Sequence, residues 1–150
     1  MSKPIAVFLV DDDADDTLLF DEVLKEVNPS VQLISATNGH EALTTLSGLS
    51  ALPDVLFLDL NMPKMDGKEC LRLIKADNAL QQIPVFMYST SSMPKDIQEA
   101  IANGASCFIT KPSSLKELRH ILSSIVNSLP DKLELAVQAL SRSAESYIVC

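Results

Sequence analysis

The sequence has no tryptophan, and aromatic residues make up only 5% of its 150 residues. Because 47% of the residues are hydrophobic, the chain can still bury a globular core, and that core must be mainly aliphatic. Long apolar runs are also missing, which excludes a membrane-spanning helix. The apolar run at residues 5–10 is too short for a signal peptide and leads into acidic residues instead of a cleavage site.

Basic residues and cysteines are both scarce. The 12 Lys and Arg residues face 20 acidic ones, so the net charge is -8, which argues against nucleic acid or an anionic membrane as a partner. The three cysteines, Cys70, Cys107 and Cys150, are an odd set without CxxC spacing. This pattern predicts neither a disulfide framework nor a zinc site, and we expect reduced thiols in a cytoplasmic protein.

The chain alternates between short apolar runs and segments whose apolar residues recur at helical spacing. This alternation predicts five β–α units, and therefore a doubly wound α/β fold with a parallel sheet and helices on both faces. The second and fifth runs carry more polar residues than the others, as edge strands can, which favours the strand order 2-1-3-4-5. The five runs cover residues 5–10, 31–36, 54–59, 83–88 and 106–110.

A C-terminal segment follows these units. We expect residues 1–129 to form one domain and residues 130–150 to form a helical extension, too short to be a separate output domain. Its apolar residues recur at spacings of four and three, which predicts a sixth helix. The narrow apolar seam favours packing against its own domain over a homodimer contact. The seam consists of Leu133, Val137, Leu140, Ala144 and Tyr147.

Charged residues follow three of the predicted strands. Asp59 ends the third run, Asp11 and Asp12 follow the first, and Lys111 follows the fifth. Since parallel strands end at one edge of a sheet, these groups should converge there. A carboxylate can accept a phosphoryl group if the transferred charge is neutralised. Mg²⁺ is suited to that task because it prefers oxygen ligands.

These motifs in combination resemble the receiver domain of two-component response regulators. The resemblance covers about residues 5–129 and rests on the acidic pair, the stretch of residues 59–67 (DLNMPKMDG), Ser89 after the fourth strand, and Lys111-Pro112. It implies a flavodoxin-like fold. It also implies a phosphoacceptor signalling domain, not an enzyme beyond self-phosphorylation and slow autodephosphorylation. The phosphoryl donor would be a histidine kinase or a histidine phosphotransfer protein. The phosphorylated protein would pass on the signal by contact with a downstream protein.

The resemblance also assigns roles to single residues. Asp59 would be phosphorylated and would bind Mg²⁺ or Mn²⁺ directly together with Asp12, while Asp11 would act through water and Asn61 through its backbone carbonyl. Lys111 and Ser89 would bind phosphoryl oxygens, and Ser89 would signal together with the aromatic residue Phe108. The Lys111–Pro112 peptide would be cis. Phe108 is equally compatible with a purely structural place in the core.

Other interpretations stay open at this point. A degenerate receiver could only dock a partner, although all the core site residues are present. A haloacid-dehalogenase-type phosphohydrolase also uses an Asp nucleophile, but it needs a general acid two residues later, where Asn61 cannot transfer a proton. Asp15 and Asp16 are expected to complement the N-terminus of the first helix, and Asp66 to cap a helix after a turn. His40 and His120 lack partners and are expected at the surface or in packing.

Overall fold

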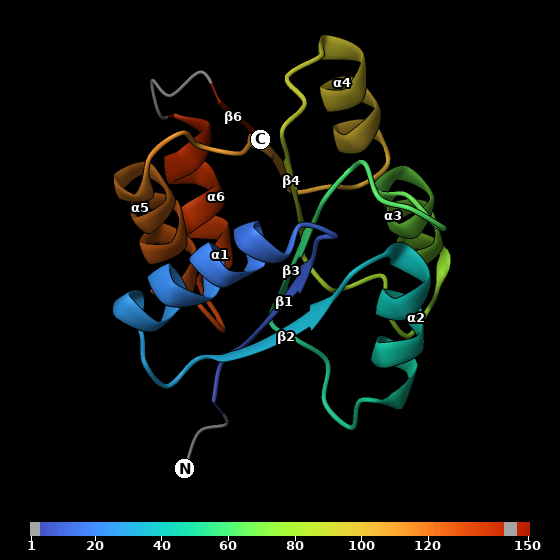
Figure 1. Cartoon of the computed structure of the whole chain (residues 1–150), viewed down its shortest axis with the longest axis horizontal. Helices are drawn as coiled ribbons and strands as arrows, with labels where there is room; N and C mark the ends of the chain where they lie inside the picture. The colour runs from blue at the N-terminus through green and yellow to red at the C-terminus, as the bar shows by residue number, and fades with distance from the viewer. Residues whose placement is uncertain (1–3, 143–146) are drawn as a thin grey trace.

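The computed structural model describes residues 4–142 and 147–150. Helices and strands alternate along most of this range (Figure 1). The strands are β1 (Ala6–Val10), β2 (Gln32–Ala36), β3 (Val55–Leu58), β4 (Val85–Ser89), β5 (Cys107–Thr110) and β6 (Ile148–Val149). The helices are α1 (Ala14–Val27), α2 (Gly39–Gly48), α3 (Gly67–Ala76), α4 (Pro94–Ala102), α5 (Leu115–Val126) and α6 (Leu133–Ser141).

The sheet has the order β2-β1-β3-β4-β5-β6. Its first five strands are parallel and follow the predicted order 2-1-3-4-5, so the predicted fold class is confirmed. The prediction that the fifth strand is an edge was wrong, because β6 pairs antiparallel with β5. The polar residues of this run are Ser106, which lies just before β5, and Thr110 at its end, so they do not distinguish an edge strand from a short internal one.

Two apolar layers sandwich the sheet because side chains alternate along each strand. Val7 and Leu9 of β1 point to the layer under α1, α5 and α6, whereas Phe8 and Val10 point to the layer under α2, α3 and α4. Figure 1 shows these two groups of helices on opposite sides of the sheet. All of β1 after its first residue, β3 and β4 is buried, as central strands covered on both faces require.

Helix α6 belongs to the first of these layers. Leu140 is buried, and Leu133 and Val137 are partly buried against the same apolar cluster, so the seam packs on its own domain as expected. The helix ends at Ser141, earlier than the spacing predicted. Tyr147 of the seam lies beyond the helix and its carbonyl accepts a hydrogen bond from Thr110. Ala144 lies outside the described residues.

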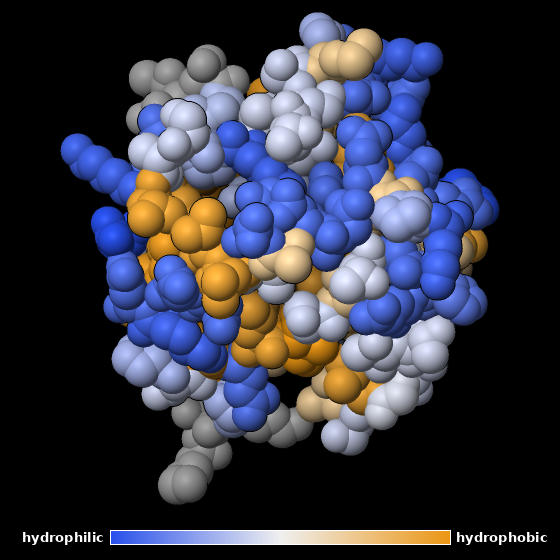
Figure 2. Space-filling view, in the orientation of Figure 1, coloured by the Kyte–Doolittle hydropathy of each residue, from blue (hydrophilic) through white to orange (hydrophobic). Residues whose placement is uncertain are grey.

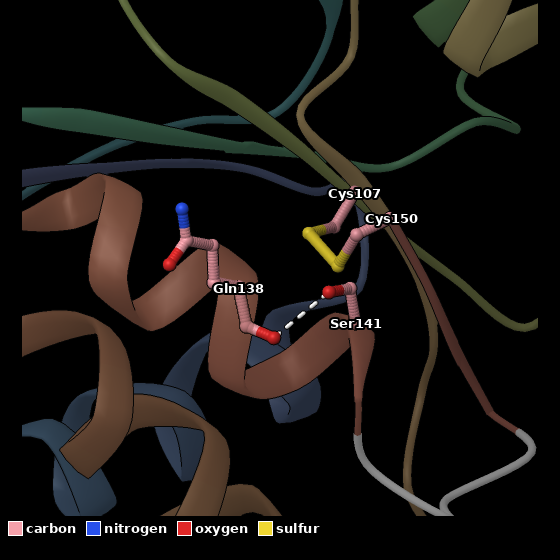
Figure 3. Close-up of a disulfide and its surroundings, with 4 residues drawn as sticks. All are labelled: Cys107, Gln138, Ser141 and Cys150. Carbon is pink, nitrogen blue, oxygen red and sulfur yellow. Dashed lines mark hydrogen bonds between the residues drawn. A yellow bond between two sulfur atoms is a disulfide. The ribbon is translucent and has the colours of Figure 1, made fainter.

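The prediction of three reduced cysteines was also wrong. Cys107 at the start of β5 and Cys150 after β6 form a disulfide across 43 residues of sequence (Figure 3). Cys70 is free and buried on α3. Short cysteine spacings do not reveal this pair, because the two cysteines are distant in the sequence and meet only through the pairing of β6 with β5.

The surface is mixed in polarity. Within the described residues, no helix is both long and apolar enough to cross a bilayer. Figure 2 shows hydrophobic side chains gathered over α1, where Leu18 and Leu19 are exposed. His40 and His120 are exposed, as expected.

We predict that α6 contributes to stability through its buried face. Leu140→Ala should lower the free energy of unfolding by about 2–5 kcal/mol, because it removes a buried side chain and leaves a cavity. Leu135→Ala on the same helix is the matched control: Leu135 is 60% exposed, against 2% for Leu140. Urea unfolding of both variants measures the difference. Equal losses of stability would show that α6 is not held by this face.

Candidate functional site

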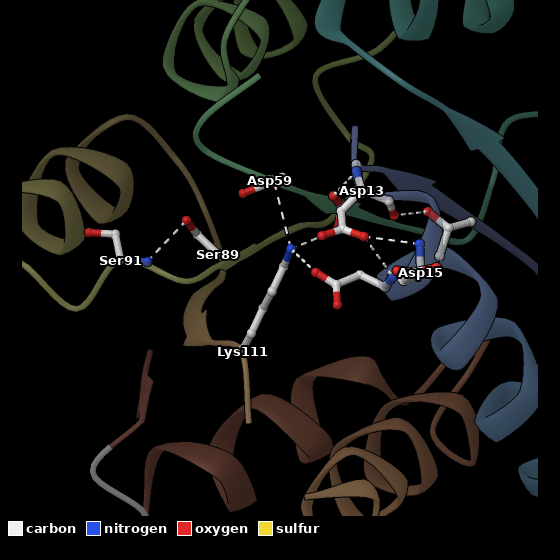
Figure 4. A network of polar contacts seen from close by, with 9 residues as sticks. Asp13, Asp15, Asp59, Ser89, Ser91 and Lys111 are labelled. Atoms are coloured by element: carbon white, nitrogen blue, oxygen red, sulfur yellow. Dashed lines mark hydrogen bonds and ion pairs between the residues drawn. The ribbon is translucent and has the colours of Figure 1, made fainter. Parts of the chain in front are cut away.

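The carboxyl ends of β1, β3 and β5 carry the charged residues that the sequence singled out. Asp59 follows β3, Asp11 and Asp12 follow β1, and Lys111 follows β5. Carboxylate oxygens of Asp11, Asp12 and Asp59 lie within 4.8 Å of one another. The structure therefore brings these predicted residues into one cluster at one edge of the sheet. Figure 4 shows Lys111 pointing toward Asp59 in this cluster.

Burial differs among the three carboxylates. Asp11 and Asp59 are 2% and 6% exposed, whereas Asp12 faces solvent. Backbone hydrogen bonds hold the two buried residues: the Asp59 N–H donates to Val10 O at 2.9 Å, and the Asp11 N–H donates to Ala36 O at 3.0 Å. The cluster thus has two fixed carboxylates and one that can adjust to a ligand.

Lys111 provides the positive charge of the cluster. Its Nζ lies 2.8 Å from Asp11 Oδ2 and 3.7 Å from Asp59 Oδ2. A third carboxylate, Asp16 Oδ2 on α1, lies 2.7 Å from the same nitrogen. Asp16 was expected only to complement the helix N-terminus. Its place in the first turn of the helix that directly follows Asp11 and Asp12 could have indicated that its side chain reaches the same edge.

The Lys111–Pro112 peptide was expected to be cis, and that prediction was wrong. The cis peptide among the described residues precedes Pro130. Lys111 points into the cluster without a cis bond, because its N–H donates to Ser89 O at 2.7 Å and three carboxylates surround its ammonium group.

Ser89 and Phe108 lie on neighbouring strands. Ser89 ends β4 with its residue fully buried, and its Oγ accepts a hydrogen bond of 3.3 Å from the Ser91 N–H. Figure 4 shows Ser89 close to Asp59 and Lys111. Phe108, in the middle of β5, is completely buried in the layer under α2, α3 and α4. This position fits the structural reading of Phe108 and leaves its switching role as a prediction.

The turn after Asp59 is built around Gly67. Asp66 caps α3 by accepting a hydrogen bond from the Glu69 N–H, which confirms its predicted capping role. The Gly67 N–H donates to Leu60 O at 2.8 Å, and a Cβ on Gly67 would lie 2.1 Å from Asp59 O. The chain can therefore return past Asp59 only because residue 67 has no side chain. Asn61 lies in this turn with its side chain exposed.

Electrostatics at the cluster are unbalanced. Burial raises the pKa of Asp59 from 3.8 to about 6, and Asp11 adds to this, although Lys111 and the backbone N–H groups of Leu60 and Asn61 lower it. Burial lowers the pKa of Lys111, but its hydrogen bonds to Asp11 and Asp16 outweigh this effect and the pKa lies above 10.5. One ammonium group thus faces an excess of carboxylates.

The donor set fits a hard divalent cation. Asp11 Oδ2 is buried, and its close partner among the described residues is the Lys111 ammonium group at 2.8 Å. Carboxylate oxygens are the ligands that Mg²⁺ and Mn²⁺ prefer, and an exposed third ligand leaves room for water. Asp11, Asp12 and Asp59 can therefore hold such an ion.

The parallel sheet, the acidic cluster and the lysine that faces it define a phosphoacceptor type of signalling domain. A family model, the response regulator receiver domain, matches residues 7–123. The chain therefore belongs to the response regulator receiver family, which confirms the resemblance seen in the sequence.

Three comparisons illustrate this membership. Response regulator Rcp1 of Synechocystis sp. is 34% identical over 129 residues, which are 83% of this chain and 88% of Rcp1. The crystal structure of the phosphorylated cyanobacterial phytochrome response regulator RcpA superposes with a TM-score of 0.77 at 34% identity, over 84% of this chain and 94% of RcpA. The Mn²⁺-bound form of Rcp1 gives 0.75 at 32% identity, over 85% and 96% of the two chains.

We predict that a side chain at position 67 destabilises the protein. Gly67→Ala should lower the free energy of unfolding by about 1–3 kcal/mol, because its methyl group would collide with the backbone at Asp59. Gly48→Ala is the control, since nothing lies within 4 Å of a Cβ there, and it should be neutral or slightly stabilising. Chemical unfolding of both variants tests this. A tolerated Gly67→Ala would show that the turn can shift without cost.

A second prediction concerns the charge of Asp59 in metal-free protein. Its pKa is raised above the unfolded value, so the folded state binds the proton more tightly and ionisation costs stability. The cost is absent below about pH 4, grows as the pH rises to about 6, and is complete above it, on the order of 3 kcal/mol. Asp59→Asn should therefore stabilise the protein at pH 7.5 in chelator, and the gain should be about threefold smaller at pH 4.5.

Urea unfolding at the two pH values measures this effect. Glu22→Gln, on the exposed face of α1, controls for the general loss of one negative charge. A pH-independent gain in both variants would attribute the effect to net charge and contradict the local cause.

Proposed function

We propose that this protein accepts a phosphoryl group on Asp59 from a histidine kinase or a histidine phosphotransfer protein. The observation that carries the proposal is the placement of a buried Asp59 carboxylate beside Asp11, Asp12 and the Lys111 ammonium group. Phosphoryl transfer needs little covalent chemistry from the protein and depends on positioning and charge neutralisation. All of these groups are supplied from strand ends, where the sheet holds them rigidly.

In the proposed reaction, a carboxylate oxygen of Asp59 attacks the phosphorus atom. The bond from phosphorus to the imidazole nitrogen of the donor breaks, and its electron pair leaves with the imidazole. A bound Mg²⁺ or Mn²⁺ would neutralise charge on the transferred group, held by Asp12 and Asp59 directly, Asp11 through water and the Asn61 carbonyl. The similarity to Mn²⁺-bound Rcp1 supports a divalent ion at these residues.

Two further residues would act on the product. Lys111 can move from its carboxylate partners to a phosphoryl oxygen, because its ammonium group has three donors on a flexible stem. The buried Ser89 hydroxyl would donate to another phosphoryl oxygen, and we propose that Phe108 responds to this contact. Because these contacts require the phosphoryl group, they would favour one conformation of the protein over another.

The surface beside Lys111 suits a protein that delivers the phosphoryl group. A pocket of about 320 Å³ is lined by Leu19 of α1, Tyr88, Lys111 and Leu115 of α5. Leu18, Leu19 and Leu115 are 58%, 41% and 48% exposed. Exposed apolar residues beside the reactive group provide a docking area for the donor protein.

Several finer assignments remain part of the proposal. We assign residues 1–129 to the receiver domain and residues 130–150 to an extension that completes its sheet and core. The readout is contact with another protein, and the location is the cytoplasm. A homodimer through the α6 seam is disfavoured, because Leu133, Val137 and Leu140 already pack on their own domain.

The decisive experiment is incubation with acetyl phosphate followed by intact-mass analysis. We expect the mass of one phosphoryl group to be added, only with Mg²⁺ or Mn²⁺ present, and no addition to Asp59→Asn. Asp77→Asn is the control. Asp77 caps the C-terminal end of α3, whereas the turn after Asp59 leads into the N-terminal end of this helix. Modification of Asp59→Asn at the wild-type rate would rule out Asp59 as the acceptor.

The same experiment separates the alternatives. A degenerate receiver that only docks a partner would gain no mass under any condition. A phosphohydrolase would release inorganic phosphate over many turnovers without accumulating the modified protein. Lys111→Ala should slow the modification while Mg²⁺ still raises the melting temperature, because the proposed lysine contact is with the phosphoryl group and not with the metal.

A further inference from the structure

The disulfide joins two residues that lie directly opposite each other on neighbouring strands. Phe108 pairs with Val149 and Ile109 with Ile148, so the same antiparallel register places Cys107 opposite Cys150. Their sulfur atoms are bonded, and their Cα atoms are 3.9 Å apart. Figure 3 shows the bond beside the last turn of α6, where Gln138 and Ser141 lie. The bond therefore fastens the C-terminal strand to β5.

Strand β6 is short, and besides the disulfide it is held by its pairing with β5 and by the packing of Ile148 on the apolar cluster. It consists of two residues, of which Ile148 is 7% exposed and Val149 is 38% exposed. Thr110 donates a backbone hydrogen bond of 2.8 Å to Tyr147 O. So short a strand at a sheet edge belongs to the least stable parts of a fold. A cross-link that closes a long loop limits the separation of this strand from its neighbour. The pairing of β6 should thus depend on the state of the two cysteines.

We propose that Cys107 and Cys150 form a redox modification site that is reduced by a dithiol and controls whether β6 covers the outer edge of β5. We rely here on the cytoplasmic location proposed above, since disulfides inside cells are usually redox-active and not structural. A pair that joins an edge strand to its neighbour is also placed to be opened without unfolding the core. The proposal does not rest on phosphoryl acceptance by Asp59, because neither its residues nor its readouts involve that site.

Access decides which sulfur reacts. Cys107 is completely buried, whereas Cys150 is partly exposed at the sheet edge. A thiolate of the dithiol therefore forms a bond to the Cys150 sulfur, the bond between Cys150 and Cys107 breaks, and the electron pair leaves on Cys107, which takes up a proton. The second thiol of the reductant, as its thiolate, then attacks the other sulfur of the reductant, the one that is bonded to Cys150. This closes the disulfide of the reductant and releases the Cys150 thiolate. The protein gains two electrons, and the dithiol becomes a disulfide.

The remaining cysteine does not compete in this exchange. Cys70 is buried on α3, and burial raises its pKa to about 12, with a smaller contribution from Asp66. It stays a protonated thiol near neutral pH and is a poor nucleophile. The exchange is therefore confined to the pair on β5 and β6.

Reduction has a structural consequence at β5. When β6 leaves, the N–H of Thr110 loses its partner, and the outer edge of β5 becomes available for pairing with another strand. Thr110 directly precedes Lys111, so this edge lies one residue from the charged cluster. Helix α6 should remain in place, because Leu140, Leu133 and Val137 also pack on the apolar cluster that α1 and α5 share.

The first test is a thiol count on the protein. Air-oxidised protein, unfolded in a maleimide reagent, should label at one cysteine, Cys70. After the folded protein is treated with dithiothreitol at neutral pH, it should label at all three. Three labelled cysteines before reduction, or one after it, would contradict the proposal, because the pair would then be either unbonded or a structural cross-link that a dithiol cannot open in the folded state.

The second test measures amide hydrogen exchange at Thr110. Reduction should accelerate this exchange at least tenfold, and Cys150→Ser should show the fast exchange without any reductant. Cys70→Ser is the matched control and should respond to dithiothreitol as the wild type does. An unchanged rate at Thr110 in reduced wild-type protein would overturn the proposal, and this arm needs no variant to fold.

Discussion

The site depends on one ammonium group that must neutralise several carboxylates in a partly buried place. Lys111 lies within 4.0 Å of three of them, Asp11, Asp16 and Asp59. Two like charges about 4 Å apart repel by on the order of 4 kcal/mol at an effective dielectric of about 20, so a single cation cannot balance the set. The raised pKa of Asp59 expresses this imbalance. A divalent cation bound at these carboxylates would offset the excess of negative charge.

The rest of the fold supplies the rigidity that holds these charges together. β1 and β3 are apolar on both faces, and their backbones are fixed by parallel neighbours on each side. Asp11 and Asp59 follow these strands directly, so they inherit the position of the strand ends. Gly67 lets the chain turn back against Asp59 without a side chain in the way. The aliphatic core therefore compensates for the electrostatic cost at its edge.

Much of this could be predicted from the sequence, and the failures have physical reasons. The buried strands and the helices with strong apolar spacing were found because their signals are local, and the convergence of Asp11, Asp59 and Lys111 follows from the parallel order of the strands. β6 was missed because two residues form too short a pattern to recognise. The disulfide was missed for the same reason, since only the pairing of β6 with β5 reveals it. Asp16 was assigned to a helix end, and its contact with Lys111 depends on the side chain's reach.

β5 connects the features that the sequence treated separately. Within four residues it carries the tethered Cys107, the buried Phe108 and Thr110, and Lys111 follows at once. The backbone of β5 is bonded to neighbours on both sides, here β4 and β6, so its position depends on both pairings. Whatever changes the pairing on the outer side therefore acts on the element that positions the ammonium group. The C-terminal segment is thus placed to influence the charge balance of the site, although none of its described residues contacts the three carboxylates of the cluster.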